Sequence, residues 1–269
     1  MSVGFAFALT LLHLNATAQE VKLGTANNYA VLAGSAITST GPTVINGGLG
    51  LTPGSSVTGG PVVNGSYDVD NAAAVQAQND LTTAYNQAAG LAPLQNLSGQ
   101  DLGGMTLTPG VYKFDSSAYL TGTLTLNCLG DPDAVFVFQI GSTLTTGSAD
   151  GSSVVTINDD GSLNPGISTF WQIGSSATLG TSTAFEGNIL AMTSITADTG
   201  ATDLDGRLLA RNGAVTLDNN TITAPPAEPE AGGSTSSAPD TGSTLLLLGS
   251  GLAALFAFGR RSTLNARHA

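Results

Sequence analysis

Residues 185–210, FEGNILAMTSITADTGATDLDGRLLA, contain one seven-residue pattern twice, because FEGNILA returns nineteen residues later as LDGRLLA. At the same offset three threonines fall into one column: Thr183, Thr202 and Thr221. A shorter relative of this stretch lies upstream at residues 36–43. A repeat of about twenty residues is typical of a solenoid, in which each coil buries its apolar side against its neighbours. The stretch therefore predicts a stack of short coils.

The segments within each repeat alternate apolar and polar residues, as VTLD at 215–218 does. In a strand, alternate side chains point to opposite faces, so Val and Leu would point into the coil and Thr would point out. A strict nineteen-residue register pairs Thr178 and Thr216 with Ala197, whereas alternation requires Thr196 at that place. We give alternation precedence and expect a one-residue slip that the turns absorb.

Residues 71–90 are different, because they are rich in Ala and Gln and have no Gly or Pro before Gly90. Apolar residues recur there at steps of three and four: Ala74, Ala77, Leu81, Tyr85 and Ala88. This spacing predicts an amphipathic α-helix, with Asp68 or Asp70 as its N-cap and Gly90 at its end. We expect its apolar stripe to lie along the flank of the solenoid.

The charge of the repeat region argues against several partners. Between residues 19 and 223 four basic residues stand against sixteen acidic ones, a formal charge of 4 − 16 = −12. A nucleic-acid partner is disfavoured, because phosphate binding requires a basic stripe. Glycine-rich segments such as residues 47–50 neither open a helix nor include a Lys, so they do not predict phosphate binding.

Side chains for catalysis and metal binding are scarce. The two histidines, His13 and His268, lie at the ends of the chain, and Cys128 is the only cysteine. The residues between those ends therefore lack the groups of a Ser-His-Asp triad, a Cys-His pair or a His-ligated metal site. A β-helix polysaccharide lyase or hydrolase needs clustered carboxylates, often with a basic partner. We predict that the protein is not an enzyme and has no catalytic residues, no cofactor and no metal.

Calcium is the weaker alternative to that prediction. Two acidic turns, at residues 203–206 and 159–161, have the carboxylates that Ca²⁺ prefers. Asp before Gly is also ordinary turn chemistry, so we interpret both segments as turns.

Residues 1–18 have the pattern of a signal peptide. They are apolar from Val3 to Leu12 and end at Ala16-Thr17-Ala18, a small-x-small cleavage pattern, although a basic segment before the apolar run is absent. We therefore predict a secreted or cell-surface protein.

The C-terminus has two parts. Residues 224–238 are Pro, Ala, Glu, Gly, Ser and Thr, which predicts a flexible linker. Residues 239–269 begin with PDTGST, continue with a mostly apolar run at 245–258 and then reach Arg260-Arg261. Fourteen apolar residues are few for a membrane span.

The order of motif, apolar run and basic pair resembles a bacterial C-terminal sorting signal. It is most similar to the exosortase type, Val-Pro-Asp-Ser/Thr-Gly, with Ala238 in place of the Val. A sortase-type Leu-Pro-x-Thr-Gly signal and a C-terminal helix packed on the core are the alternatives. The resemblance implies a sorting protease of the cell envelope as a partner, and contact with the membrane only through this segment.

Residues 21–223 contain an ordered set of distinctive segments: LGTA at 23–26, YAVLAG at 29–34, LTPGVY at 107–112, AVFVFQ at 134–139, FWQIGSSATLGT at 170–181, GNILA at 187–191, SIT at 194–196, TGAT at 199–202, GRLLAR at 206–211 and GAVTLDNNTI at 213–222. With these segments the region resembles the microbial ice-binding protein family of the DUF3494 type.

This resemblance implies a mostly β fold: a discontinuous right-handed β-helix of triangular section, with one long α-helix packed along its side. Its N-terminal and C-terminal parts would build neighbouring coils. It also implies that one flat face binds ice, in some members through Thr-Ala/Gly-x-Thr/Asn motifs, which segments 40–43, 196–199 and 199–202 match. We therefore predict an ice-binding, antifreeze-type monomer that inhibits ice growth and recrystallisation.

Our candidate face consists of Thr-rich strand and turn positions. Thr has a methyl group and a hydroxyl on one stiff χ1, and rows of such groups repeat about every 4.7–4.9 Å across a sheet, which approaches the spacing of water in ice. The predicted residues are Thr38, Thr40, Thr43, Thr178, Thr181, Thr183, Thr196, Thr199, Thr202, Thr216, Asp218 and Thr221. The alternative function is a surface adhesin or matrix protein of the same fold that binds glycans or surfaces.

Overall fold

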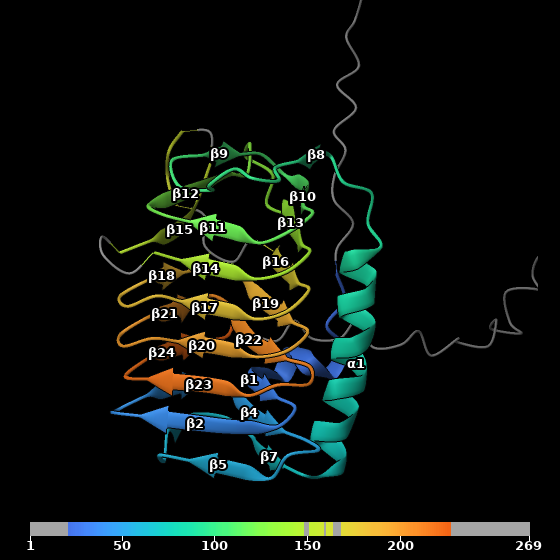
Figure 1. The fold of residues 1–269 in the computed structure, drawn as a ribbon, viewed down its shortest axis with the longest axis vertical. Helices are drawn as coiled ribbons and strands as arrows, with labels where there is room; N and C mark the ends of the chain where they lie inside the picture. The colour runs from blue at the N-terminus through green and yellow to red at the C-terminus, as the bar shows by residue number, and fades with distance from the viewer. Residues whose placement is uncertain (1–20, 148–150, 159, 164–167, 227–269) are drawn as a thin grey trace, which may run out of the picture. The chain divides into compact units, whose positions relative to one another are not determined.

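The computed structural model describes residues 21–147, 151–158, 160–163 and 168–226, which are mostly β-structure (Figure 1). The predicted signal peptide, most of the linker and the predicted sorting signal lie outside the described residues. The strands form three sheets, A, B and C, and every paired strand runs parallel to its neighbours.

The strands follow one another in space as follows. Sheet A contains β7 (Tyr67–Val69), β4 (Gly48–Leu51), β1 (Tyr29–Ala33), β22 (Arg207–Ala210), β19 (Asn188–Ala191), β16 (Ser168–Ile173), β13 (Val135–Ile140), β10 (Gly110–Phe114) and β8 (Gln95–Asn96). Sheet B contains β11 (Ala118–Leu120), β14 (Leu144–Thr146), β17 (Ala177–Leu179), β20 (Ile195–Ala197), β23 (Val215–Asp218), β2 (Ala36–Thr40) and β5 (Ser56–Thr58). Sheet C contains β6 (Val62–Val63), β3 (Val44–Asn46), β24 (Thr221–Thr223), β21 (Thr202–Leu204), β18 (Ala184–Phe185), β15 (Ser153–Ile157), β12 (Thr123–Asn127) and β9 (Thr106–Leu107).

The chain visits the three sheets in turn, so that three successive strands make one coil. Strands β16 to β18, β19 to β21 and β22 to β24 are consecutive coils of this kind. In sheet A, Asn188 pairs with Arg207, which is the nineteen-residue repeat of the sequence. The repeat therefore reports the length of one coil.

The predicted one-residue slip is confirmed in sheet B. Thr178 pairs with Thr196 eighteen residues later, and Thr196 pairs with Thr216 twenty residues later. The turn before β23 has four residues, 211–214, where the turn before β20 has three, 192–194. Turn length thus absorbs the slip and leaves the alternation within the strands intact.

The stack is discontinuous in sequence. Strands β1, β2 and β3 pair with β22, β23 and β24, although about 180 residues separate them along the chain. Strands β4 to β7 continue the stack beyond them. Figure 1 shows the N-terminal coils in blue directly beside the last coil in orange, and the chain returning along the side of the stack through α1 (Ala72–Ala89). The predicted interleaving of the two parts of the chain is therefore present.

Apolar side chains from all three sheets fill the inside of the coils. Three aromatic rings, from β13, β16 and β18, lie in contact in this core. The ring centroids of Phe138 and Trp171 are 3.9 Å apart, and those of Trp171 and Phe185 are 5.0 Å apart. Cys128 is part of the same buried core. Each fully buried side chain of this size stabilises the fold by about 1.5–3 kcal/mol.

Helix α1 covers the outer face of sheet A, and this explains why inner strands such as β1, β13 and β22 are buried on both faces. All five residues of the predicted stripe are buried, namely Ala74, Ala77, Leu81, Tyr85 and Ala88, and Ala84 is buried with them. The predicted N-cap is wrong, because Asn71 Oδ1 accepts the hydrogen bond from the amide of Ala74 at 2.9 Å. Asp68 instead accepts from Asn71 Nδ2 and from the Tyr29 hydroxyl. Among the described residues, we find no helix long and apolar enough to cross a membrane.

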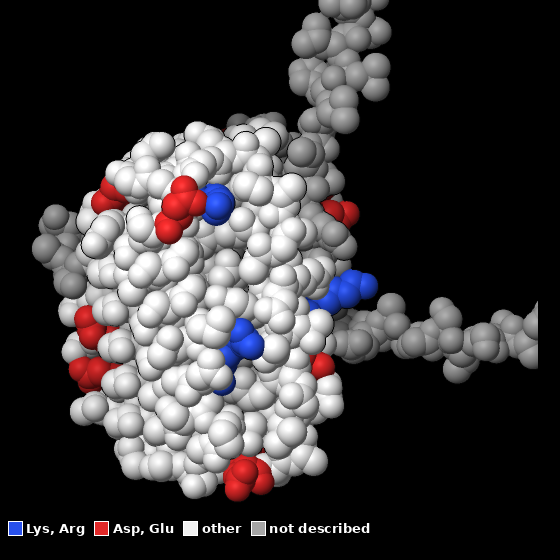
Figure 2. Space-filling model, turned by 45° about the vertical axis from the view of Figure 1, so that its right-hand side comes forward, with Lys and Arg blue, Asp and Glu red and all other residues white. Residues whose placement is uncertain are grey.

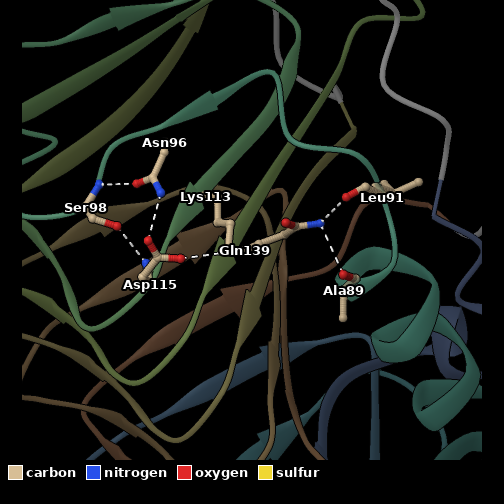
Figure 3. Close-up of polar contacts among 7 residues, drawn as sticks. All are labelled: Ala89, Leu91, Asn96, Ser98, Lys113, Asp115 and Gln139. Carbon is tan, nitrogen blue, oxygen red and sulfur yellow. Dashed lines mark hydrogen bonds and ion pairs between the residues drawn. The ribbon is translucent and has the colours of Figure 1, made fainter.

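A buried glutamine forms hydrogen bonds with the C-terminal end of α1. Gln139 Nε2, on β13, donates hydrogen bonds of 2.8 Å to the carbonyl oxygens of Ala88 and Leu91, and Figure 3 shows it directed at this end of the helix. Carbonyl groups in the last turn of a helix have no partner within the helix, so a side-chain donor satisfies them. Gln139 therefore fixes the position of α1 on the outer face of sheet A.

Arg207 stabilises the contact between the N-terminal coils and the last coil in sequence, which contains β22 to β24. Its guanidinium donates to the Asn27 carbonyl at 3.1 Å, to Asn188 Oδ1 at 2.8 Å and to the Pro225 carbonyl at 3.0 Å. The residue is 2% exposed. If the guanidinium were removed, its acceptors would stay away from water without a hydrogen bond, which is costly. The Arg207 contacts therefore stabilise the pairing of the N-terminal and C-terminal coils more than a surface ion pair would.

We predict that Arg207→Met lowers the free energy of unfolding by about 3 kcal/mol, because one buried acceptor, Asn188 Oδ1, and two partly buried carbonyl oxygens lose their donor. Urea denaturation followed by circular dichroism measures the change. The control is Lys113→Met, which removes the exposed Lys113–Asp115 ion pair of 2.8 Å (Figure 3). Exposed pairs contribute little, so the control should keep the wild-type midpoint. Equal midpoints for all three proteins would contradict the role given to Arg207.

Candidate functional site

Six threonines stand in register on sheet B, one on each of six neighbouring strands. In spatial order they are Thr145, Thr178, Thr196, Thr216, Thr38 and Thr58. We call this set the threonine row. Because neighbouring strands lie about 4.7–4.9 Å apart, the row repeats one side chain at that interval. The strands of sheet B lie one above another across the front of Figure 1.

Alternation along each strand turns the row outward. In β20 the row residue Thr196 lies between Ile195 and Ala197, both buried, and β17 and β23 have the same pattern. None of the six hydroxyl groups of the row is hydrogen-bonded to another part of the described chain. The row therefore presents methyl groups and hydroxyls whose hydrogen-bonding capacity is left for water.

A second rank of small side chains lies beside the row. Two residues before each row threonine the chain has, in the same order, Thr143, Ser176, Ser194, Ala214, Ala36 and Ser56. Ala36 and Ser56 open β2 and β5, and they share a face with Thr38 and Thr58 because positions two apart in a strand point to the same side. The other four lie in the turns just before their strands. Small residues at these six positions add no long side chain beside the row.

Sheet B is also nearly free of charge. Asp218 is the one Asp, Glu, Lys or Arg in its seven strands. Figure 2 shows that most of the surface in view is uncharged and that the basic residues on it do not gather into a stripe. The strands of sheet B therefore lack the basic side chains that attract phosphates.

The structure divides the predicted site residues among several places. Thr38, Thr178, Thr196 and Thr216 belong to the threonine row. Thr40 and Asp218 pair with each other at the margin of sheet B, and Thr199 donates to Asp218 from the turn beyond it. Thr181 also lies in an exposed turn, whereas Thr202 and Thr221 pair with each other on sheet C.

Two of the predicted site residues are wrong. Thr43 is 1% exposed and Thr183 is fully buried, so neither can contact a surface. The Thr43 hydroxyl accepts from the amide of Asn220, and the Thr183 hydroxyl bonds to that of Thr146 at 2.6 Å. Both threonines lie where the chain turns from sheet B to sheet C, and there the side chain points into the corner.

The prediction missed Thr145 and Thr58. A sequence signal for Thr145 exists, because GSTLT at 141–145 matches GSSAT at 174–178, and the structure pairs these two segments. Additional residues in the coil between them stretch the interval to 33 residues and hide it from a nineteen-residue search. Thr58 follows from its pairing with Thr38 across β5 and β2.

Sheet C presents a different surface. Its side chains bond to one another: Asn64 to Asn46 at 2.8 Å, Asn46 to Thr223 at 3.0 Å and Thr123 to Ser153 at 2.9 Å. Leu204 and Val62 are about half exposed on it. This mixture of satisfied polar groups and apolar side chains lacks the uniform repeat of sheet B.

A buried carboxyl group is the other unusual feature. Asp203 points into the core from β21, is fully buried, and neither of its oxygens has a hydrogen-bond partner. Burial, reinforced by the negative charges of Asp205 and Glu186, raises the pKa of Asp203 well above its ordinary value, and Arg207 opposes this only in part. The surroundings of Asp203 therefore favour its neutral form over the charged form.

These carboxyl groups do not form a metal centre. Within the ranges that the structure describes, no three His, Cys, Asp or Glu side chains are grouped so that they could hold a metal ion. Asp159, in the second acidic turn, lies outside those ranges.

We predict that Asp203→Asn raises the melting temperature at about pH 8 and has little effect at about pH 4. The pKa of Asp203 is higher in the folded protein than in the unfolded chain. As the pH rises above the unfolded-state pKa, the unfolded chain therefore ionises first, and the folded protein loses stability relative to it. The neutral amide removes that loss. Calorimetry at the two pH values measures the difference.

The exposed Asp133→Asn is the matched control and should change stability by less than about 0.5 kcal/mol at both pH values. A melting temperature for Asp203→Asn that falls at high pH would show that the carboxylate is ionised and stabilising.

Comparison with known proteins gives one consistent result. The sequence profile described as Ice-binding-like matches residues 31–223. The chain is 55% identical, over 246 residues, to an ice-binding protein from Nostoc sp. (strain HG1), covering 89% of this chain and 87% of that protein. It is 36% identical to an ice-binding protein from Colwellia sp., covering 76% of this chain and 84% of that one.

Solved structures agree with these relatives. An ice-binding protein from an Antarctic biological consortium superposes with a TM-score of 0.71 at 44% identity, covering 84% of this chain and 96% of that chain. An ice-binding protein from the Antarctic ascomycete Antarctomyces psychrotrophicus gives 0.69 at 39% identity, covering 77% and 99%. The mostly β fold with parallel sheets and one helix is therefore shared with these structures.

Proposed function

This chain belongs to the Ice-binding-like family, and we propose on that basis that it adsorbs to ice through the threonine row of sheet B. The observation that carries the assignment to sheet B is the register of six outward threonines whose hydroxyls have no partner in the described chain. Adsorption of this kind inhibits ice growth and recrystallisation, and it requires no catalytic residue and no cofactor.

The chemistry of the row suits ordered water. Each hydroxyl can anchor a water molecule, and the neighbouring methyl group restricts the other positions that water can take. The stiff χ1 of Thr keeps the two groups in a fixed arrangement. The interval of about 4.7–4.9 Å between strands approaches the spacing of water molecules in ice, so successive residues can meet successive lattice positions.

Rigidity is the second requirement, because many weak contacts add only if the surface does not move. Every row residue except Thr58 lies on a strand that is paired at both edges. We propose that the stack is a right-handed β-helix of triangular section, in which each flat side is one sheet. This geometry holds sheet B flat over its whole length.

We propose export and a monomeric state for the mature protein. Residues 1–18 would be removed as a signal peptide, the domain would comprise residues 19–223, and residues 224–238 would link it to a sorting signal at 239–269. Support comes from the small-x-small site at Ala16-Thr17-Ala18 and from the PDTGST motif before an apolar run. A protein that controls ice outside the cell has to be secreted or held at the cell surface.

We expect Thr196→Tyr and Thr216→Tyr to abolish most of the thermal hysteresis, because each ring stands above the row and keeps a flat lattice away. Nanolitre osmometry of the purified protein measures this. Thr202→Tyr and Thr221→Tyr on sheet C are the matched controls and should retain wild-type activity. The reverse pattern would assign ice binding to sheet C.

Absence of activity in folded wild-type protein at high micromolar concentration would exclude ice binding altogether. A glycan array tests the alternative, a surface adhesin of the same fold, with the same preparation.

Expression of the whole chain in a bacterial host should yield a mature N-terminus at Gln19, since the predicted cleavage follows Ala18. N-terminal sequencing of the exported protein, with an Ala16→Asp and Ala18→Asp variant as the uncleaved control, measures this. An intact Met1 in the exported fraction would contradict the signal peptide.

A further inference from the structure

Tyr119 lies on sheet B directly beyond Thr145, at the end of the threonine row. It lies at the centre of β11 and pairs with Thr145, so the sheet places it where a seventh threonine would stand. Its side chain is 54% exposed, and no ring contact or hydrogen bond ties its phenol group to the rest of the described chain. A phenol ring reaches further from the backbone than the side chain of Thr, so it projects beyond the plane of the row.

The next coil beyond Tyr119 does not continue the row either. The backbone of Tyr119 bridges to Asp101 on the next coil. The carboxylate of Asp101 accepts hydrogen bonds from the Gly103 amide at 2.7 Å, from the Thr121 amide at 2.9 Å and from the Thr121 hydroxyl at 2.6 Å. Although burial acts against it, these bonds lower the pKa of Asp101 and keep it charged. A charged, hydrated group thus follows the aromatic ring.

We propose that Tyr119 sets the boundary of the ice-contacting surface at the β11 end and thereby limits the number of coils that meet the lattice. A rigid, flat ice surface cannot bend around a projecting ring, so contact ends at Thr145. This inference rests on the proposed function of the threonine row. It makes Tyr119 a residue that determines the extent of the surface without being part of the contact.

The test is Tyr119→Thr in the full chain, with thermal hysteresis measured against wild type at matched molar concentrations. The substitution extends the row from six threonines to seven, and Thr is well suited to a strand. We expect a higher thermal hysteresis than wild type. Tyr119→Val removes the ring without adding a hydroxyl, and it should also exceed wild type.

Tyr119→Phe is the matched control, because it keeps the ring and removes only the hydroxyl; it should equal wild type. Circular dichroism melting verifies that each variant is folded. Equal or lower activity of both the Thr and Val variants would overturn the proposal, and so would an equal gain in the Phe variant. A wild-type protein without thermal hysteresis would instead refute the function of the row itself.

Discussion

Parallel backbone pairing between successive coils is the interaction on which the other features depend. Each interior strand is hydrogen-bonded at both edges, and this fixes which residue of one coil stands beside which residue of the next. A shift by one residue would turn every outward side chain inward, so burial of the apolar residues locks the register. Six threonines from strands of unequal spacing in sequence thereby fall into one line. The alignment of the outward threonines therefore follows from the packing of the apolar residues inside the coils.

The same pairing joins two distant parts of the chain into one surface. Thr38 and Thr58 come from the N-terminal coils, whereas the other four row residues come from coils that follow α1. The surface is continuous because β2 pairs with β23, and the buried guanidinium of Arg207 supports this joint from sheet A. Helix α1 bridges the distance along the outer face of sheet A and leaves sheet B uncovered.

The sequence predicted the coil length, the alternation and the helix, since each leaves a local pattern. The one-residue slip near Thr196 was also predictable, because the alternation of apolar and polar residues within a strand constrains the register more strongly than the average nineteen-residue repeat. The partition of threonines between sheets was not predictable, because it depends on where the chain turns from sheet B to sheet C. The turns at 180–183 and 198–201 leave Thr183 inside a corner and place Thr202 on sheet C. Pairing of Val31 with Leu208 has no local signal at all, and only resemblance to a family predicted it.

Ice-affinity partition of wild-type protein and of Thr178→Tyr tests the central claim most directly. A slowly growing ice mass excludes solutes and retains only molecules that bind its surface. The account predicts that wild type concentrates in the ice, whereas Thr178→Tyr, folded but with a ring at the second position of the row, stays in the liquid. Equal retention of the two proteins would show that ice binds elsewhere on the molecule, and exclusion of both would show that the protein does not bind ice.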